Sequence, residues 1–470
     1  MSVRVACAMM GLAVAWKAVA RPALSFVVLV GEGQGWSSLS VPMDEADPRS
    51  ASPEVRTPNL DRLAREGMRF GRFLAASPRC TPSRAAILTG RSPAQLRMTF
   101  VSEGRGDDGG AATRLAPATA SKELASETTT LAEVLRGKGY ATARFGKWHL
   151  GRTDPSRHGF DASSGATSNG GPDNSEHPNP KQAFASADAA VAFIRRAVGE
   201  GRPFYVHLCQ YAGKSVLDAR PETYAAAEER LGARGRARAG AVAVAEDADA
   251  AQGRVLAVLD ELGVAGGTYV FYTTDHGAPG RNPPLAGGKG TLGEGGLRVP
   301  LLVRGPGVPA GASSRVMATM VDLLPTIAGL AGADVSGVPG IEGGSLEPVF
   351  RDPAGGVVRR ARESFVVHFP HYDKDPLGPV SVIYRGDWKL VRVHEDGGLR
   401  LFDLGRDPSE VRDLSRELPC KASELDAELT AYLKGVNAAM PTAREPGGKA
   451  VEASSLPGER RGRRKGKGKE

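Results

Sequence analysis

Short apolar runs alternate with helix-forming segments through most of this 470-residue chain. Residues 25–30 (SFVVLV) form a continuous apolar run, which is typical of a strand buried on both faces of a sheet. Further strands are predicted at residues 140–145, 204–209 and 269–273. Because helical segments separate these strands, the pattern predicts an α/β fold: a large, mostly parallel sheet sandwiched by helices.

The predicted helices have recognisable ends. Thr57 is expected to cap one helix, with Pro58 in its first turn, and Thr130 is expected to cap another that ends before Gly139. The four predicted helices between the strands span residues 57–67, 130–138, 187–198 and 241–262. Three stretches rich in small and polar residues are predicted to be surface insertions, at 102–120, 163–180 and 232–240.

The pattern of predicted elements changes near residue 360. Short strands are predicted at 364–369, 381–385, 388–393 and 400–402, followed by a helix at 422–433. This order predicts a small antiparallel sheet with one helix. We therefore expect a main domain over residues 25–355 and a small C-terminal α+β domain over residues 356–440, since the chain is longer than one core usually serves.

Both ends of the chain are expected to lie outside these domains. Residues 1–24 combine a basic start, an apolar run and an Ala-x-Ala-like site, which predicts an export signal and a periplasmic or secreted protein. An uncleaved N-terminus is the alternative. Residues 441–470 are predicted to be a disordered basic tail, in which seven Lys or Arg and two Glu at 459–470 account for +5 of the net charge of +8. Binding of this tail to a polyanion is possible, but nothing indicates specific nucleic-acid recognition.

The apolar run in the leader is too short to span a bilayer, and no later run is long enough. The four cysteines, Cys7, Cys80, Cys209 and Cys420, are far apart and form no CxxC pair. Neither a zinc cluster nor a disulfide framework is therefore implied.

The segment 79–90 (RCTPSRAAILTG) carries the most specific motif in the chain. Cys80–Arg84 (CTPSR) with Leu88–Gly90 (LTG) resembles the C-x-P-S-R…L-T-G signature of the formylglycine-dependent sulfatase family, which has an alkaline-phosphatase-like fold. A lone Cys near a helix start is commonly a buried free thiol, but here the whole string matches. The resemblance implies that a separate formylglycine-generating enzyme oxidises Cys80.

Formylglycine explains why the family needs a Cys at this position. Its hydrated aldehyde carries two hydroxyls, of which one attacks sulfur and the other releases sulfate by C–O cleavage, so that one hard step becomes two. By resemblance, Arg84 supports the formylglycine and the metal.

Two further segments carry cations that the resemblance assigns to the site. Gly146–Gly151 (GKWHLG) matches a family element in which Lys147 would contact sulfate and His149 would act as the base that regenerates the aldehyde. Gly287–Thr291 (GGKGT) matches another, in which Lys289 would bind sulfate and help to protonate the leaving oxygen. Fixed cations suit a substrate whose leaving group gains negative charge in the transition state.

The resemblance also implies a Ca²⁺ site, where this chain departs from the family pattern. Two adjacent Asp are usual after the first strand, but Glu32 and Gly33 stand in their place. Asp275 and His276 match the later metal pair, and the converted Cys80 completes the predicted ligands. Since Ca²⁺ takes six or more oxygens, we expect weak binding, water ligands, or a carboxylate from elsewhere.

Asp44 or Asp47 is a candidate for that missing carboxylate. A second departure lies in residues 210–216 (QYAGKSV), where Lys214 replaces the family's His. Lys214 is predicted to bind substrate together with Lys147 and Lys289, although its reach and pKa differ from those of His.

Three functions remain open from the sequence. The preferred one is a sulfatase that acts on a sulfated polysaccharide or a small sulfate ester, with aryl sulfates as surrogates. The alternatives are a degenerate anion-binding relative without turnover, and a phosphate or phosphonate monoester hydrolase of the same superfamily. In the string 368–372 (HFPHY), half-buried aromatic packing is the preferred role for His368, Pro370, His371 and Tyr372, and lining of the pocket rim is the alternative.

Overall fold

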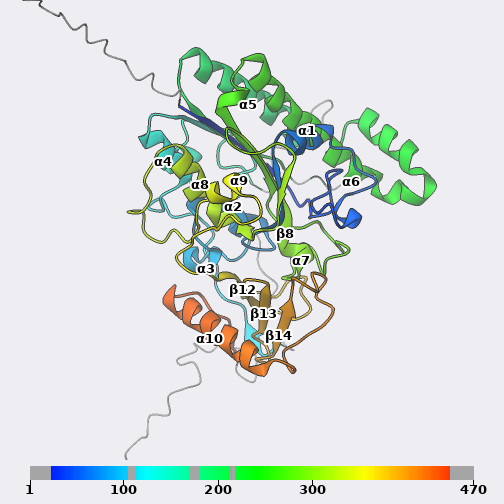
Figure 1. Ribbon diagram of the computed structural model, residues 1–470, viewed down its shortest axis with the longest axis vertical. Helices are drawn as coiled ribbons and strands as arrows, with labels where there is room; N and C mark the ends of the chain where they lie inside the picture. The colour runs from blue at the N-terminus through cyan, green and yellow to red at the C-terminus, as the bar shows by residue number, and fades with distance from the viewer. Residues whose placement is uncertain (1–22, 104–112, 169–179, 212, 214–217, 445–470) are drawn as a thin grey trace, which may run out of the picture.

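A computed structural model describes residues 23–103, 113–168, 180–211, 213 and 218–444 (Figure 1). Three predicted features lie outside the described residues: residues 1–22 of the export signal, Lys214, and residues 445–470 of the tail. The start of that tail is not disordered as predicted, because β15 (Thr442–Ala443) pairs with β3 (Leu115–Ala116). Among the described residues, no helix is both long and apolar enough to cross a membrane.

A nine-stranded sheet forms the centre of the molecule, in the order β10-β2-β8-β7-β1-β6-β4-β5, with β9 paired to β2. Its strands are β1 (Ser25–Gly31), β2 (Met68–Leu74), β4 (Ala141–Gly146), β5 (Ala162–Ser163), β6 (Phe204–Cys209), β7 (Thr268–Thr274), β8 (Arg298–Arg304), β9 (Ala312–Ser314) and β10 (Ala318–Thr319). Only β8 runs antiparallel to its neighbours, β2 and β7. The predicted mostly parallel α/β sheet is therefore confirmed.

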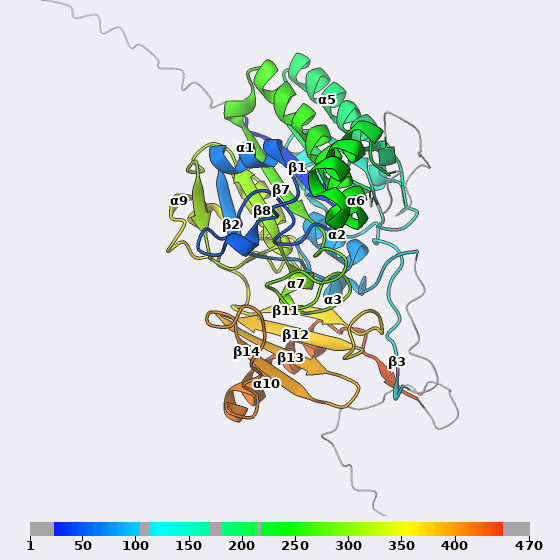
Figure 2. The ribbon, with the colours of Figure 1, turned by 90° about the vertical axis from the view of Figure 1, so that its right-hand side faces the viewer.

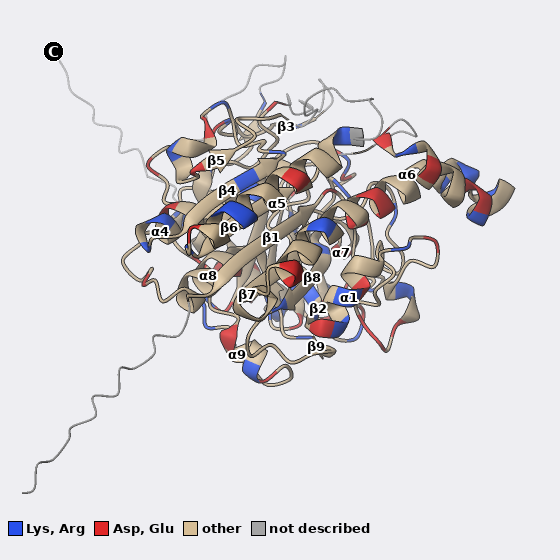
Figure 3. Cartoon of the chain, turned by 90° about the horizontal axis from the view of Figure 1, so that it is seen from above, with Lys and Arg blue, Asp and Glu red and all other residues tan. Residues whose placement is uncertain are grey.

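Helices cover both faces of this sheet (Figures 1 and 2). The α-helices of the described residues are α1 (Pro58–Glu66), α2 (Cys80–Thr89), α3 (Pro93–Leu96), α4 (Leu131–Gly137), α5 (Ala183–Gly199), α6 (Pro221–Glu261), α7 (Glu294–Leu297), α8 (Leu323–Leu330), α9 (Glu347–Arg351) and α10 (Pro419–Gly435), of which α10 packs away from this sheet. Successive residues of β1 serve opposite faces: Val27 and Leu29 join one core with α1, α5 and α6, whereas Phe26 and Val28 join the other with α2, α4 and α8. Acidic and basic residues are mixed on the outer helices α1 and α6 (Figure 3).

The helix ends were partly as predicted. Thr130 forms a complete capping box with Glu133, so its predicted role is confirmed. Thr57 is the N-cap residue of α1, but its hydroxyl hydrogen-bonds with Ser40 and not with the helix. The prediction of a surface insertion at 232–240 was wrong, because this stretch is helical within α6 and only Gly232 has a non-helical conformation.

A small antiparallel sheet lies below the main one in Figure 2, in the order β11-β12-β13-β14. Its strands are β11 (Phe365–Phe369), β12 (Val380–Arg385), β13 (Trp388–Val393) and β14 (Leu399–Asp403). One face packs on α10 through Ile383, Leu390 and Leu429, while Val367 and Phe369 belong to the core of the main sheet. The predicted antiparallel sheet with one helix is confirmed, and this sheet sits directly against the main fold.

Candidate active site

Four neighbouring strands end at one edge of the main sheet and deliver polar residues there. Glu32 follows β1, Asp275 follows β7 and Lys147 follows β4, and the spatial order of these strands is β7-β1-β6-β4. Since the strands are parallel, their carboxyl ends meet at the same edge, where ligands bind in open α/β sheets. Residues distant in the sequence are thereby brought into contact.

Cys80 is the first residue of α2, whose N-terminus faces this edge. The Cys80 side chain is buried, and its Sγ lies 3.2 Å from His276 Nε2 and 3.4 Å from Glu32 Oε1. Burial and the charge of Glu32 oppose ionisation of the thiol, but Lys147 and His276 outweigh them and lower the pKa of Cys80 to about 6. The site therefore favours an anionic or electron-rich group at this position.

Glu32 is the carboxylate shared by a cationic cluster of Lys147, Arg84 and Lys289. It accepts hydrogen bonds from Lys147 Nζ (2.7 Å), Arg84 Nη2 (3.1 Å) and Lys289 Nζ (3.2 Å). Burial alone would raise the pKa of Glu32, but Lys147 and the other cations hold it well below its usual value. Three cations predicted to bind sulfate or support the nucleophile thus share one carboxylate.

Asp275 lies on the other side of Arg84. Its Oδ2 accepts from Arg84 Nε (3.2 Å) and Nη2 (3.1 Å), and its Oδ1 accepts from Gly33 N (3.1 Å). Burial, together with the nearby charge of Glu32, raises the pKa of Asp275 to about 6. Two buried carboxylates this close together favour an additional cation between them.

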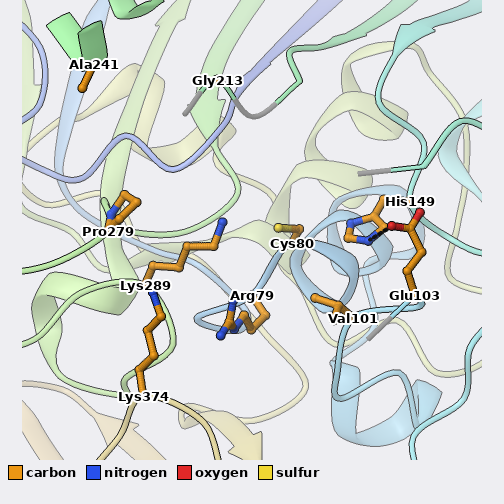
Figure 4. Close-up of a pocket in the computed structure, with 10 residues that line it drawn as sticks. All are labelled: Arg79, Cys80, Val101, Glu103, His149, Gly213, Ala241, Pro279, Lys289 and Lys374. Atoms are coloured by element: carbon orange, nitrogen blue, oxygen red, sulfur yellow. Dashed lines mark ion pairs between the residues drawn. The ribbon is translucent and has the colours of Figure 1, made fainter. Parts of the chain in front are cut away.

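His149 lies beside Cys80 in the pocket shown in Figure 4. Its backbone is in the left-handed region (φ 60°), and its carbonyl accepts from Thr81 Oγ1 at 2.8 Å. Neither ring nitrogen has a hydrogen-bond partner among the described residues. Burial, followed by the charges of Lys147 and Arg84, lowers the pKa of His149 to about 3, so that the ring is neutral.

Lys289 reaches the cluster from a loop that requires glycine on both sides. A Cβ at Gly288 would lie 2.0 Å from Gly280 O, and a Cβ at Gly290 (φ 88°) would lie 2.7 Å from Asp373 Oδ2. Burial favours the neutral amine of Lys289, but Glu32 outweighs it and raises the pKa. The loop therefore holds a protonated ammonium over the cluster.

The residues present fit a divalent cation. Ligand atoms of Glu32, Cys80, Asp275 and His276 all lie within 4.8 Å of one another. Burial opposes protonation of His276, but Asp275 and Cys80 outweigh it and raise its pKa to about 9. A bound cation would displace the proton from Nε2, while Nδ1 donates to Gly277 O at 3.0 Å. The predicted metal ligands are thus brought together, and the crowded carboxylates suit a hard cation.

Asp44 and Asp47 do not supply the missing carboxylate. Asp44 pairs with Arg315 (2.7 Å) and Asp47 with Arg49 (2.8 Å), and neither belongs to the cluster. Within the string 368–372, His371 hydrogen-bonds Thr99 (2.8 Å) and packs on Phe100, consistent with the expected packing role.

A pocket of about 660 Å³ opens above Cys80 (Figure 4). Sequence reasoning singled out three of its lining residues: Cys80, His149 and Lys289. It missed Arg79, Glu103 and Lys374, which come from loops where no motif or periodicity marks them. Of these three residues, only Arg79 has a sequence signal, which is that it directly precedes Cys80.

This combination of fold and site defines an α/β protein of the alkaline-phosphatase-like class, with a buried cationic site for an anion. A family model described as Sulfatase matches residues 25–333, and one described as N-sulphoglucosamine sulphohydrolase, C-terminal, matches residues 288–438. The chain belongs to the sulfatase family.

Named relatives agree with this assignment. The chain is 32% identical to N-acetylgalactosamine-6-sulfatase of Sus scrofa over 69% of its own length and 65% of that protein. It is 34% identical to steryl-sulfatase of Mus musculus over 67% of its length and 64% of that protein. The chain thus spans slightly less than two thirds of these relatives. The crystal structure of Ps i-CgsB in complex with k-i-k-neocarrahexaose shares the fold, with a TM-score of 0.71, 22% identity, and coverage of 87% of this chain and 93% of the other.

Proposed function

We propose that the chain is a sulfuric ester hydrolase that removes sulfate from a sulfated carbohydrate, using a formylglycine made from Cys80. The observation that carries this proposal is the position of Cys80 beneath an open pocket, with His149 and Lys289 beside it. Lys147, buried behind it, adds a further cation. The family membership and the named sulfatases among the relatives support the same reaction.

The cations bind and polarise the sulfate. Lys147 has no exposed surface and Lys289 is largely buried, so both act in a dry environment where a fixed charge interacts strongly with an anion. A sulfate ester can compete with Glu32 for these ammonium groups as it enters. Arg84 stays on Asp275 and orients that carboxylate.

Proton transfers fall to two residues with opposite pKa shifts. Lys289, with its raised pKa, holds the proton for the leaving oxygen, while neutral His149 accepts one from a hydroxyl at position 80. The hydrated aldehyde of formylglycine supplies two hydroxyls on one carbon, for attack on sulfur and for release of sulfate. Lys214, which lies outside the described residues, is proposed as a further anion-binding residue.

A Ca²⁺ ion would be held by Glu32, Asp275, His276 and the converted residue 80. When bound, it would act as a Lewis acid toward sulfate oxygens. Conversion of Cys80 would require a formylglycine-generating enzyme as a partner. The leader-like residues 1–24 support export to the periplasm or the medium.

Sulfate release measured by ion chromatography tests the proposal directly. Protein with Cys80 conversion confirmed by peptide mass would be incubated with sulfated polysaccharides and aryl sulfates, with Ca²⁺ or with chelator. We expect release that Cys80→Ala abolishes and chelator reduces. Absence of release on every substrate, with conversion confirmed, would instead support an anion-binding protein without turnover.

The runner-up activity, hydrolysis of phosphate or phosphonate monoesters, is separated by the same assay. Matched aryl phosphate and aryl phosphonate esters would be offered beside the aryl sulfate. Faster turnover of either phosphorus ester would overturn the sulfatase assignment.

A further inference from the structure

The turn Asp373–Asp375 joins the small C-terminal part of the chain to two segments of the site, the one that carries Cys80 and the one that carries Lys289. Asp373 forms a two-bond ion pair with Arg79, the residue before Cys80. Asp375 is buried, and its Oδ2 accepts a hydrogen bond from Leu292 N at 2.9 Å, three residues beyond Lys289. The two acidic side chains therefore fasten the turn on both sides of the pocket.

Lys374, between these two anchors, points into the pocket mouth. It is exposed, it lines the pocket, and among the residues that the structure describes it makes neither a hydrogen bond nor an ion pair. A Cβ built on Gly290 would lie 3.2 Å from Lys374 Cβ and Cγ, so the base of the side chain packs on the Lys289 loop. Figure 4 shows Lys374 extending toward Lys289.

Among the described residues that line the pocket, no carboxylate pairs with Lys374. Asp373 is engaged by Arg79, and the oxygens of Asp375 accept backbone N–H groups of Leu292 and Leu377. Glu103, the acidic residue that lines the pocket, lies beside His149 on the far side of Cys80 (Figure 4). A second cation is thus held above the site, beyond the one that Lys289 contributes.

We propose that Lys374 binds a second anionic group of the substrate, which makes the preferred substrate a saccharide that carries another sulfate or a carboxylate beside the sulfate removed. This inference rests on the proposed function, because it assumes that an ester sulfate occupies the inner site. An ammonium is a compact point charge and accepts either anion. Because the side chain is exposed, the pair should be worth up to about a fivefold change in KM.

Steady-state kinetics on converted enzyme tests the proposal. The substrates are an aryl sulfate with one charge, a disulfated disaccharide, and a monosulfated disaccharide with a uronic acid. The variants are Lys374→Gln and the matched control Lys138→Gln, an exposed lysine at the C-cap of α4, which lies at the opposite edge of the sheet because β4 begins there.

We expect Lys374→Gln to raise KM for the doubly charged substrates up to about fivefold more than KM for the aryl sulfate. Lys138→Gln should change neither value. The disulfated and uronate substrates identify which anion is preferred. An equal change of KM on all substrates, or no change on either disaccharide, would overturn the proposal.

A binding measurement separates this outcome from failure of the proposed function. Isothermal titration of Cys80→Ala protein with the disulfated disaccharide needs no turnover. Weaker binding after the additional Lys374→Gln change supports the second anion site even if no sulfate is released. Unchanged binding overturns the site, whatever the activity of the converted enzyme.

Discussion

At the scale of single residues, His149 and Lys289 predict an unusual pH profile. The lowered pKa of His149, about 3, keeps its ring neutral at all higher pH values, and the raised pKa of Lys289 keeps its amine protonated at all lower ones. Both groups are therefore in the required state throughout the neutral range. We expect kcat/KM for an aryl sulfate, measured at constant ionic strength and in saturating Ca²⁺, which would keep its proposed ligand Asp275 ionised, to be level between about pH 5 and 8.

An acid limb centred near the ordinary His pKa, about 6.5, would contradict this assignment. The control is His149→Gln, which keeps the approximate size and polarity of the ring without a titrating group. It should lower kcat strongly and leave the shape of the profile unchanged.

Gly33 leads to a second prediction at this scale. Its φ of 61° is in the left-handed region, and a Cβ there would lie 3.3 Å from His276 Cε1. Gly33→Asp should therefore cost about 1 kcal/mol of stability, while placing a carboxylate next to the proposed metal ligands. We expect calorimetric Ca²⁺ affinity about tenfold above that of Gly33→Asn, which has the same shape without the charge. Equal affinities would show that the added carboxylate does not reach the cation.

At the scale of elements, a buried ion network ties β13 to the Lys289 loop. Lys389 Nζ, with no exposed surface, donates to Glu410 (2.7 Å), to Glu294 (3.1 Å) and to the carbonyl of Leu292 (2.8 Å). Burial raises the pKa of Glu410, whereas Lys389 and Arg298 outweigh burial at Glu294 and lower its pKa to about 2. Glu294 also pairs with Arg298 (2.8 Å), whereas among the described residues the ion-pair partner of Glu410 is Lys389.

Lys389→Met should destabilise the fold by about 3–5 kcal/mol at pH 7, because it leaves the buried carboxylate of Glu410 without its cation. Urea unfolding measures this loss, and Lys434→Met, an exposed lysine at the end of α10, is the control. The deficit should shrink toward pH 5, since protonation removes the uncompensated charge. A loss below about 1 kcal/mol would mean that water replaces the ammonium.

In the wild-type protein, the lowered pKa of Glu294 determines whether its ion pairs stabilise the fold more at high or at low pH. Its contribution to stability is present above the unfolded value of about 4.3, and is lost as the pH falls from there toward about 2.

The elements differ in how far the sequence predicts them. Strands β6 and β13 match their predictions to the residue. Strand β6 is a nearly continuous apolar run, and β13 begins directly after a turn at Gly386 and Asp387. Strand β2 was not predicted, since Arg69 and Arg72 and an irregular register interrupt its apolar pattern. The antiparallel direction of β8 follows from its tertiary pairing, which local sequence does not encode.

The residues of the site likewise divide into those that the sequence predicts and those that it does not. Glu32, Lys147 and Asp275 converge, because each follows a strand that ends at one edge of the sheet. Asp44 and Asp47 do not, because ion pairs with Arg315 and Arg49 hold them elsewhere. The stretch 232–240 appeared to be a loop for lack of an apolar stripe, although Gly235 and Ala239 are small enough to be buried within a helix. Rim residues such as Lys374 depend on how the small sheet meets the large one, and no local pattern reports that contact.

At the scale of the whole molecule, the proposed metal site predicts that stability depends on calcium. Binding to the folded state alone adds RT ln(1 + [Ca²⁺]/Kd), about 2.7 kcal/mol at one hundred times Kd. We expect the melting temperature in millimolar Ca²⁺ to exceed that in chelator by a few degrees, with a smaller effect of Mg²⁺, which gives up its water reluctantly. Identical melting in Ca²⁺ and chelator would argue against a site of useful affinity.

The burial of α2 determines when Cys80 would be accessible to another enzyme. All ten residues of this helix are buried, and Cys80 retains 2% of its exposure. The proposed converting enzyme would have to reach the backbone around Cys80 while this segment is still extended, before the chain folds. A molecule that folded with its thiol intact would then stay unconverted, and the proposed activity of a preparation would be decided before the native state forms.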